Sequence, residues 1–251
     1  MNKKLITYLV SFAAFFGPFT QSIYTPLLPV VQQEFGTSEL MVNLTISIFT
    51  FVLAIMQIIY GPLTDTWGRR KVLLPGILVY VAASVGAAFA ASIYLFLFFR
   101  VLQAAGMAVG SVVATTVIGD MYEGKLRGRA MGTFQTLVAL GPAVGPVIGG
   151  FVGEYFGFHG VFWVLAFTGG LLWTLNFLFL PETKPDSFSG NRFHVRDFAQ
   201  ILTKPAAPVL FCWGLCNTLP FIISWFFCRR YSPYFISYRR VRMVWFSCPC
   251  R

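Results

Sequence analysis

Charge is scarce in this sequence. Of its 251 residues only 11% are charged; nine are acidic and two are histidine. Soluble globular domains carry charge on about a quarter of their residues, so the composition excludes an ordinary soluble domain. The chain is instead rich in apolar residues, which make up 57% of it and include 28 phenylalanines. With a mean hydropathy of +0.71, this composition is typical of a membrane protein.

The residue patterns of common enzyme chemistries are also lacking. The sequence has no phosphate-binding glycine loop, no metal-ligand spacing and no nucleophile beside a plausible base. His159 and His194 fall in different predicted loops, and Cys248 and Cys250 lack the spacing of a metal site. We therefore expect no enzyme activity, no bound metal and no cofactor. The net charge of +10 does not predict a nucleic-acid partner, because the bases lie in short clusters between apolar runs.

Long apolar runs dominate the chain. A bilayer core of about 30 Å takes about 20 helical residues, so a run of about 18 or more predicts a membrane span. Seven such runs are present, at 5–29, 41–60, 72–92, 94–118, 131–153, 161–180 and 206–228. Seven in succession, with short joins, argue against buried helices of a soluble protein. The first run continues to Pro29 without a cleavage motif, so it predicts a membrane helix rather than a signal peptide.

Basic residues are confined to alternate loops. The loops 30–40 and 154–160 and the join near 93 hold no Lys or Arg. Because short basic loops stay on the cytoplasmic side, the sequence predicts a multi-pass protein of the inner or plasma membrane with a cytoplasmic N-terminus. The twelve bases of the other loops are Lys3, Lys4, Arg69, Arg70, Lys71, Lys125, Arg127, Arg129, Lys184, Arg192, Arg196 and Lys204.

Four segments follow from these runs. We expect a six-helix transmembrane bundle at 1–180, a cytoplasmic linker at 181–204, a seventh helix at 205–228 and a basic tail at 229–251. The tail carries six arginines and no acid, yet the seventh helix would place it outside, against the positive-inside rule. We hypothesise that the gene is truncated or frameshifted near or after residue 228.

One turn between two apolar runs is unusually rich in special residues. It reads GPLTDTWGRRKV at 61–72. A glycine at 61 allows close helix approach, a glycine at 68 allows positive φ, and Asp65 can meet the positive end of the following helix. A solvated turn whose bases only fix topology is the simpler reading. However, the turn resembles the loop signature of the major facilitator superfamily at all six defined positions: Gly61, Leu63, Asp65, Gly68, Arg69 and Arg70.

That resemblance implies a cytoplasmic latch. In the family the aspartate pairs with arginines of neighbouring helix ends while the inner gate is shut, so Asp65 takes that role here by resemblance. Arg127 and Arg129, in the other short cytoplasmic loop, are the candidate partners. The sequence does not decide which of them pairs, if either does.

The fifth predicted span carries a glycine ridge. Glycines recur every fourth residue, which gives a surface for close helix packing, and Pro142 and Pro146 should bend the helix. Ordinary small-residue packing would explain the ridge alone. The stretch is also similar to the antiporter signature of the same family, which implies export rather than uptake. The signature positions are Gly141, Gly145, Pro146, Gly149 and Gly150.

The fourth predicted span contains the one charged residue well inside spans one to six, Arg100. A charge at membrane depth is a functional candidate by default, although snorkelling to the outer interface is an alternative for this position. Arg100, Gln103, Met107 and Ser111 share one helical face and predict a cavity wall. They resemble the family's fourth-helix motif, which implies a role for Arg100 in proton transfer or gating. Ala104 replaces one glycine of that motif.

The first predicted span has Pro26 and Pro29 near its outer end and Gly17 upstream. These residues resemble the first-helix signature of 12-span drug:proton antiporters. Gln21 and Tyr24 are candidates to line a substrate cavity, or they satisfy backbone groups freed by Pro26. No Asp or Glu lies well inside spans one to six, so either Arg100 tunes a proton site elsewhere or the protonated carboxylate belongs to a missing half.

Together, the resemblance implies an all-α membrane protein with a six-helix half, built as two inverted three-helix repeats, plus a seventh helix. The implied function is proton-coupled efflux of small drug-like molecules by alternating access. The implied partners are membrane lipid, a small-molecule substrate, protons and a complementary C-terminal half. Two alternatives stay open: a truncated, non-transporting fragment, and a solute importer of the same fold.

Overall fold

The computed structural model describes residues 3–180. The predicted linker at 181–204, the seventh helix at 205–228 and the tail at 229–251 lie outside the described residues. So do all five cysteines and His194.

Every regular element in the described range is helical. The elements, in chain order, are α1 (Lys3–Ile23), η1 (Thr25–Leu27), α2 (Leu28–Glu34), α3 (Glu39–Trp67), α4 (Arg69–Ala88), α5 (Ile93–Met121) and α6 (Gly124–Phe179). Five helical stretches within them are long and apolar enough to cross a membrane. The predicted all-α membrane fold is thereby confirmed.

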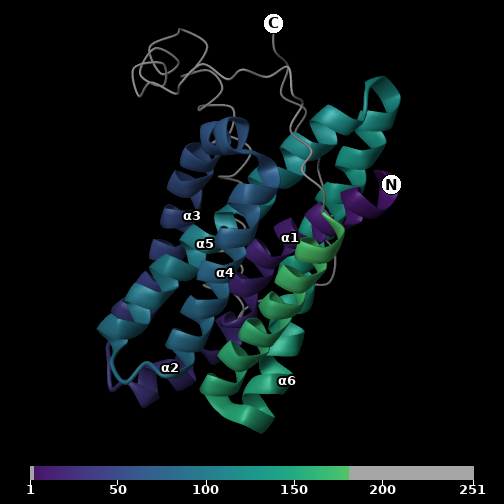
Figure 1. Cartoon of the computed structure of the whole chain (residues 1–251). Helices are drawn as coiled ribbons and strands as arrows, with labels where there is room; N and C mark the ends of the chain where they lie inside the picture. Colours follow the sequence, from purple (N-terminus) through teal and green to yellow (C-terminus); the bar gives the residue numbers. More distant parts are fainter. Residues whose placement is uncertain (1–2, 181–251) are drawn as a thin grey trace, which may run out of the picture. The chain divides into compact units, whose positions relative to one another are not determined.

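The longest helix, α6, is two crossings joined by a reversal. Its 56 residues would extend about 84 Å at 1.5 Å per residue, far beyond a bilayer core of about 30 Å. The backbone reverses at Gly157, where φ is 66° and ψ is −172°. Figure 1 shows the two arms of α6 running back along each other. The arms, 124–156 and 158–179, contain the predicted fifth span and all but the last residue of the sixth.

The first crossing differs from its prediction. The sequence predicts one span over 5–29, whereas the structure ends α1 at Ile23 and continues through η1 into α2 as far as Glu34. Pro26 and Pro29 lie in the first turns of η1 and α2 respectively. Proline has no N–H to continue the preceding helix but fits the first turn of a new one, which is the physical reason for the break.

The crossings pack around α1 and α5, the two most buried segments, while α3 is the least buried. α1 lies chiefly against α6 and α5, and α4 lies against α5 and α6. Glycine permits the closest approaches: a methyl group added at Gly106 would lie 2.6 Å from the carbonyl oxygen of Gly76. Such close backbone contact is the main attraction between helices in lipid, where burying apolar surface gains little.

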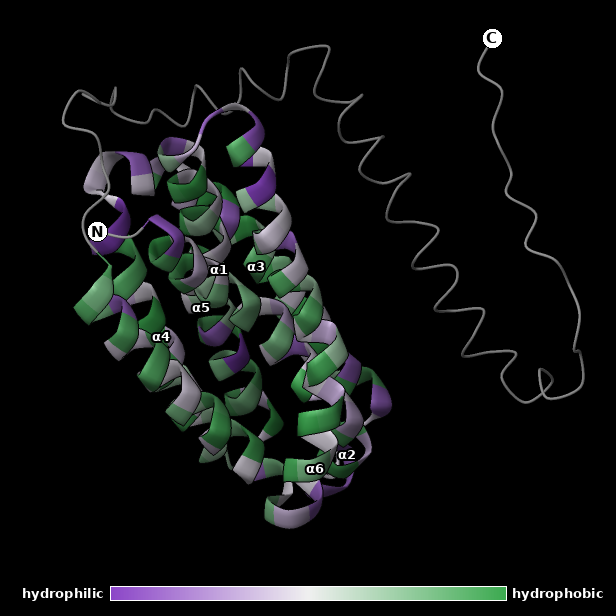
Figure 2. Cartoon of the chain, turned by 90° about the vertical axis from the view of Figure 1, so that its right-hand side faces the viewer, coloured by the Kyte–Doolittle hydropathy of each residue, from purple (hydrophilic) through white to green (hydrophobic). Residues whose placement is uncertain are grey.

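Charged residues collect at the ends of the bundle. We call the end that holds Lys3, Gly68 and Met121 the N-terminal end; the hydrogen bond from Lys3 Nζ to the carbonyl oxygen of Met121 closes it at 3.3 Å. α2 and the Gly157 reversal lie at the opposite end (Figure 1). In Figure 2, hydrophobic residues run along the helices and many hydrophilic residues gather at the two ends. Apart from Arg100, the described Lys and Arg residues all lie near the N-terminal end, consistent with a membrane orientation set by basic loops.

Candidate functional site

The turn between α3 and α4 has the geometry expected of its glycine. Gly68 has φ of 98° and ψ of 151°, in a region that a side chain with a Cβ rarely adopts. Its N–H donates to the carbonyl oxygen of Thr64 at 3.2 Å. Gly68 therefore ends α3 and starts α4 without an intervening loop.

The two arginines that follow fasten this turn to other helix ends. Arg69, whose side chain is 6% exposed, forms an ion pair with Asp120 at the end of α5, whose side chain is 33% exposed. Arg70 donates through Nη2 to the carbonyl oxygen of Phe177 at 2.7 Å, near the end of α6, and its guanidinium lies 5.5 Å from the centre of the Phe177 ring. The turn thus holds the end of α3, the start of α4 and the ends of α5 and α6 together at the N-terminal end.

The predicted latch residue, Asp65, lies in the last turn of α3 and is exposed. It forms no ion pair with a residue of 3–180. Gly68, which has no side chain, is the N-cap of α4, so Asp65 does not occupy the capping position of that helix. Its candidate partners, Arg127 and Arg129, are also exposed. The latch role of Asp65 stays a prediction, while the ion pair present in this region joins Arg69 to Asp120.

Gly61 does not make the expected close contact among the described helices. Nothing in 3–180 lies within 4 Å of the position that a Cβ would take there. By contrast, Gly119 on α5 is covered by the guanidinium of Arg127, whose Nη2 would lie 3.2 Å from an added Cβ. Close approach at this end therefore occurs between α5 and α6, not at Gly61.

Arg100 is fully enclosed by four helices. It lies on α5 with 0% of its surface exposed, so its side chain does not snorkel to the interface. Its guanidinium carbon lies 4.8 Å from the ring centre of Tyr24, the N-cap of η1, and 4.5 Å from that of Phe49 on α3. Aromatic faces attract cations most strongly where water is excluded. The two rings therefore hold a positive charge inside the bundle.

A chain of hydrogen bonds links Arg100 to α4. Its Nη1 donates to Gln103 Oε1 at 3.0 Å, Gln103 Nε2 donates to Ser84 Oγ at 2.7 Å, and Ser84 donates to the carbonyl oxygen of Tyr80 at 2.8 Å. Arg100 Nε and Nη2 have no hydrogen-bond partner among the described residues. The three N–H groups on these two nitrogens therefore lack an acceptor in the described range.

The two cavity candidates of the first predicted span, Gln21 and Tyr24, lie in different environments. Tyr24 is buried and its hydroxyl lies 3.0 Å from Thr45 Oγ1, so it packs with Arg100 rather than on an open surface. Gln21 is partly exposed and donates through Nε2 to Thr50 Oγ1 at 2.8 Å. Gln103 and Met107 of the predicted cavity wall are buried as well, and only Ser111 of that stripe is partly exposed.

The glycine ridge of α6 lies against the backbone of α1. A Cβ at Gly141 would be 2.9 Å from the Phe19 nitrogen, one at Gly145 would be 2.9 Å from the Ile23 nitrogen, and one at Gly149 would collide with the Ile23 carbonyl oxygen. The ridge is therefore a close-packing surface, as the sequence predicts.

Two signature residues of this helix lie off the ridge. Nothing in the described range lies within 4 Å of a Cβ at Gly150, and Pro146 is exposed. α6 also stays helical through Pro142 and Pro146, with its non-helical backbone at Gly157.

Several residues of these sites do not stand out in the sequence. Phe49 is one of many phenylalanines and Ser84 one of many small residues, so their contacts with Arg100 and Gln103 depend on tertiary packing. Asp120 had a weak signal, as an acid at the helix end next to a basic loop. Gly106 and Gly110 had a clearer sequence signal, since their four-residue spacing repeats that of the α6 ridge. In the structure, an added Cβ at Gly110 would lie 2.7 Å from the Ala13 carbonyl oxygen.

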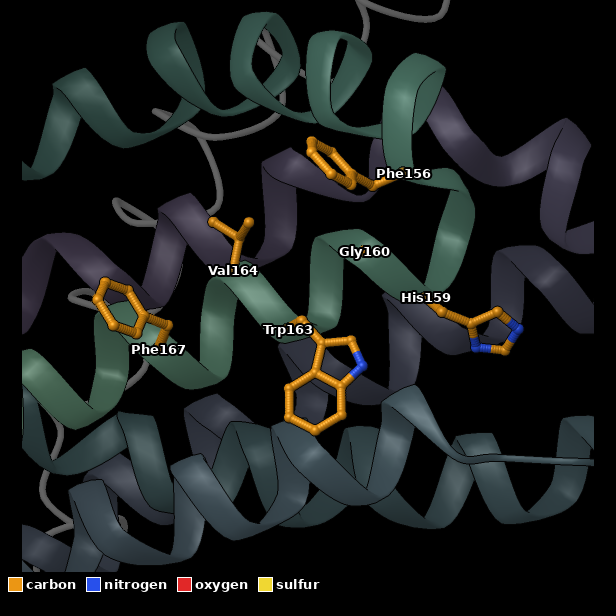
Figure 3. Close-up of a pocket in the computed structure, with 6 residues that line it drawn as sticks. All are labelled: Phe156, His159, Gly160, Trp163, Val164 and Phe167. Carbon is orange, nitrogen blue, oxygen red and sulfur yellow. The ribbon is translucent and has the colours of Figure 1, made fainter.

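A separate groove lies along the second arm of α6, near the opposite end of the bundle. Its volume is about 460 Å³, and its lining is almost entirely apolar (Figure 3). Its lining residues are Phe156, His159, Gly160, Trp163, Val164 and Phe167. None of the predicted site residues lines it.

His159 contacts two other helices. Its Nδ1 lies 2.7 Å from the carbonyl oxygen of Ala88, and its Nε2 lies 3.9 Å from Glu34 Oε1. These contacts tie α6 to α4 and α2. Among residues 3–180 no group of three or more His, Cys, Asp or Glu side chains could hold a metal ion.

Comparison with known proteins agrees with this arrangement. The family model of the major facilitator superfamily matches residues 10–238. Quinidine resistance protein 1 of Saccharomyces cerevisiae is 32% identical over 73% of this chain and 32% of its own length. Citrate exporter 1 of Aspergillus niger is 34% identical over 72% of this chain and 35% of its own length. The chain therefore spans about a third of the length of these curated relatives.

Solved structures show the same fold. A bacterial homologue of the human lysosomal transporter Spinster, in an inward-facing and unoccupied conformation, superposes with a TM-score of 0.68 at 20% identity. The match covers 81% of this chain and 50% of that one. With the helical bundle and the ridge of α6 on α1, the match of the family model to residues 10–238 leads to one assignment: the chain belongs to the major facilitator superfamily.

Proposed function

We propose that the chain takes part in proton-coupled efflux of small, drug-like molecules across the plasma membrane by alternating access. The observation that carries the proposal is the seating of Gly141, Gly145 and Gly149 against the α1 backbone. That ridge resembles the family's antiporter signature, and it joins the first crossing to the fifth without side chains between them.

The names of two relatives support export. One is called a quinidine resistance protein and the other a citrate exporter. Because the chain spans about a third of each, the activity of a whole transporter is proposed here together with a complementary half that completes the path.

We place the N-terminal end of the bundle in the cytoplasm. Lys3, Arg69 and Arg127 belong to the basic set at this end, which the positive-inside rule keeps on the cytoplasmic side. On this placement the Arg69–Asp120 ion pair and Asp65 lie at the inner gate. Asp65 is exposed there and is free to reach a residue of the complementary half when that gate closes.

Proton coupling is assigned to Arg100 and its surroundings. A buried cation favours a deprotonated carboxylate nearby and so lowers that carboxylate's proton affinity. Arg100 is fully buried beneath Tyr24 and Phe49, so a carboxylate of the complementary half would feel its charge through these rings without touching it. Protonation of that carboxylate would then alternate with this attraction during the transport cycle.

Dye efflux tests this function. Cells that express a complete transporter containing this half are loaded with a fluorescent dye, with and without a protonophore, beside cells carrying an empty vector. We expect faster dye loss than in the vector control, and that difference should vanish when the proton gradient is collapsed. Equal loss in both strains contradicts the proposal for this chain. Dye accumulation driven by the gradient points instead to the importer.

A further inference from the structure

Two glutamine–hydroxyl pairs lie on the α3 side of the bundle and are unexplained by the sites above. Gln21 on α1 donates to Thr50 on α3 at 2.8 Å, and Gln57 on α3 donates to Ser111 on α5 at 2.9 Å. None of these four residues is buried. Thr50 and Gln57 are seven residues apart, so they share a face of α3 about 10.5 Å apart along its axis.

Both pairs lie within the predicted spans of their helices. Thr50 is near the middle of the span 41–60, and Gln57 is three residues from the end of that span. Uncharged amides at this depth rarely face lipid, because unsatisfied polar groups are costly in hydrocarbon. The partly exposed pairs are therefore expected to face a polar cavity rather than lipid.

Backbone contacts fix the direction of each pair. The Thr50 hydroxyl donates to the carbonyl oxygen of Ile46 at 3.0 Å, and the Ser111 hydroxyl donates to that of Ala108 at 3.1 Å. A hydroxyl has one hydrogen, so each can only accept from its glutamine, and the amide N–H must point toward it. No residue in 3–180 bonds to the side-chain carbonyl oxygen or to the second N–H of either glutamine.

We infer that Gln21 and Gln57 form a two-point recognition site for uncharged molecules that carry a hydroxyl or amide group on an apolar body. Each glutamine offers an acceptor and a donor, which a hydroxyl or amide matches. A carboxylate would need a cation, and Arg100 is fully buried beneath Tyr24 and Phe49. An ammonium would need a carboxylate, and the described spans carry none well inside. The inference rests on the proposed function, since it names the substrate class of that transport path.

Binding of a matched probe pair tests the site. The full chain is placed in phosphatidylcholine nanodiscs and equilibrated with 1-naphthol or 1-methoxynaphthalene, which differ in one hydrogen-bond donor. Empty nanodiscs give the partition of each probe into lipid. After that correction we expect a preference for naphthol of about 3- to 10-fold, the range of one net hydrogen bond to a neutral group.

Three variants separate the site from general effects. Gln57→Met and Gln21→Met keep side-chain length but remove the amide, and each should reduce the preference toward 1. Gln33→Met, on α2 and exposed, should leave it unchanged. Circular dichroism and gel filtration verify folding. If one of the two site variants does not fold, the other still tests the site.

The other outcomes are distinct. Equal corrected binding of both probes, or a preference that survives both site variants, overturns this inference and leaves the transport proposal standing. Citrate that displaces naphthol would indicate an anion site and would also overturn it. No binding of either probe above empty nanodiscs counts against substrate binding by this chain, and so against the proposed function itself.

Discussion

Arg69 at the start of α4 and Asp120 at the end of α5 form an ion pair at the N-terminal end of the bundle, with the arginine almost fully buried. It links two crossings that also pack along their lengths. The acid that the sequence singles out, Asp65, is exposed nearby. Of the two acids, the structure uses Asp120 for a contact within the described helices.

We expect Asp120→Asn to destabilise the bundle by about 1–3 kcal/mol, because Arg69 would keep its charge without a carboxylate. This free energy lies between the cost of losing an exposed ion pair and the cost of breaking a buried one. Thermal unfolding of the purified chain in nanodiscs measures this effect. Asp65→Asn serves as the control and should change the unfolding temperature little. An equal loss in both variants would contradict the assignment of the structural pair.

Asp65→Asn is expected to act on transport instead. In a complete transporter that contains this half, the variant should express normally but lose most dye efflux, because the predicted latch needs the negative charge of Asp65. Efflux per molecule of surface-expressed protein is the measurement. Unchanged efflux would remove Asp65 from the gate.

Gly149→Ala should disrupt the contact between α6 and α1. Its methyl group would meet the Ile23 carbonyl oxygen, and overpacking of this kind costs about 1–3 kcal/mol. Gly150→Ala, one residue along, meets nothing within 4 Å in the described range and should be tolerated. Unfolding temperature and the gel-filtration profile compare the two. Similar behaviour of both variants would contradict the packing seen here.

Gly68→Ala and Gly61→Ala form a second matched pair. Gly68 has φ of 98° and ψ of 151°, so alanine there is strained and should cost about 1–3 kcal/mol. Gly61 lies within α3 with open space around it, where alanine should be neutral or add up to about 1 kcal/mol. Chemical denaturation in detergent gives both values. If Gly61→Ala lowers transport without lowering stability, its close contact is with the complementary half.

Arg100→Lys should abolish most efflux while the protein remains folded. Lysine keeps the charge but cannot stack its head group flat on Tyr24 and Phe49 while donating to Gln103. Arg100→Met removes a buried charge and should leave the unfolding temperature equal or higher. Lys71→Arg, an exposed basic exchange in the first turn of α4, is the control for efflux. Full efflux in Arg100→Lys would rule out a specific role for the guanidinium.

The sequence by itself determined the fold class and the positions of the crossings. Apolar run length follows directly from bilayer thickness, so six spans could be placed before the structure was known. The sequence also predicted where the backbone would need a glycine: Gly68 has the positive φ expected of the turn. The ridge at Gly141, Gly145 and Gly149 follows from helical periodicity, which puts every fourth residue on nearly the same face.

Only the tertiary structure decided which side chains meet. Contacting residues are far apart in the chain. Arg69 and its partner Asp120 are 51 residues apart, Arg100 and Phe49 are 51 apart, and Gln57 and Ser111 are 54 apart. Helix rotation and crossing geometry set such contacts, and periodicity within one helix carries no information about the facing helix. For the same reason Tyr24, predicted to line a cavity, packs on a buried cation, while Gln57 gained a place in the proposed recognition site. Sequence pattern fixes a helix and its faces, but the neighbour that covers each face is a property of the packed bundle.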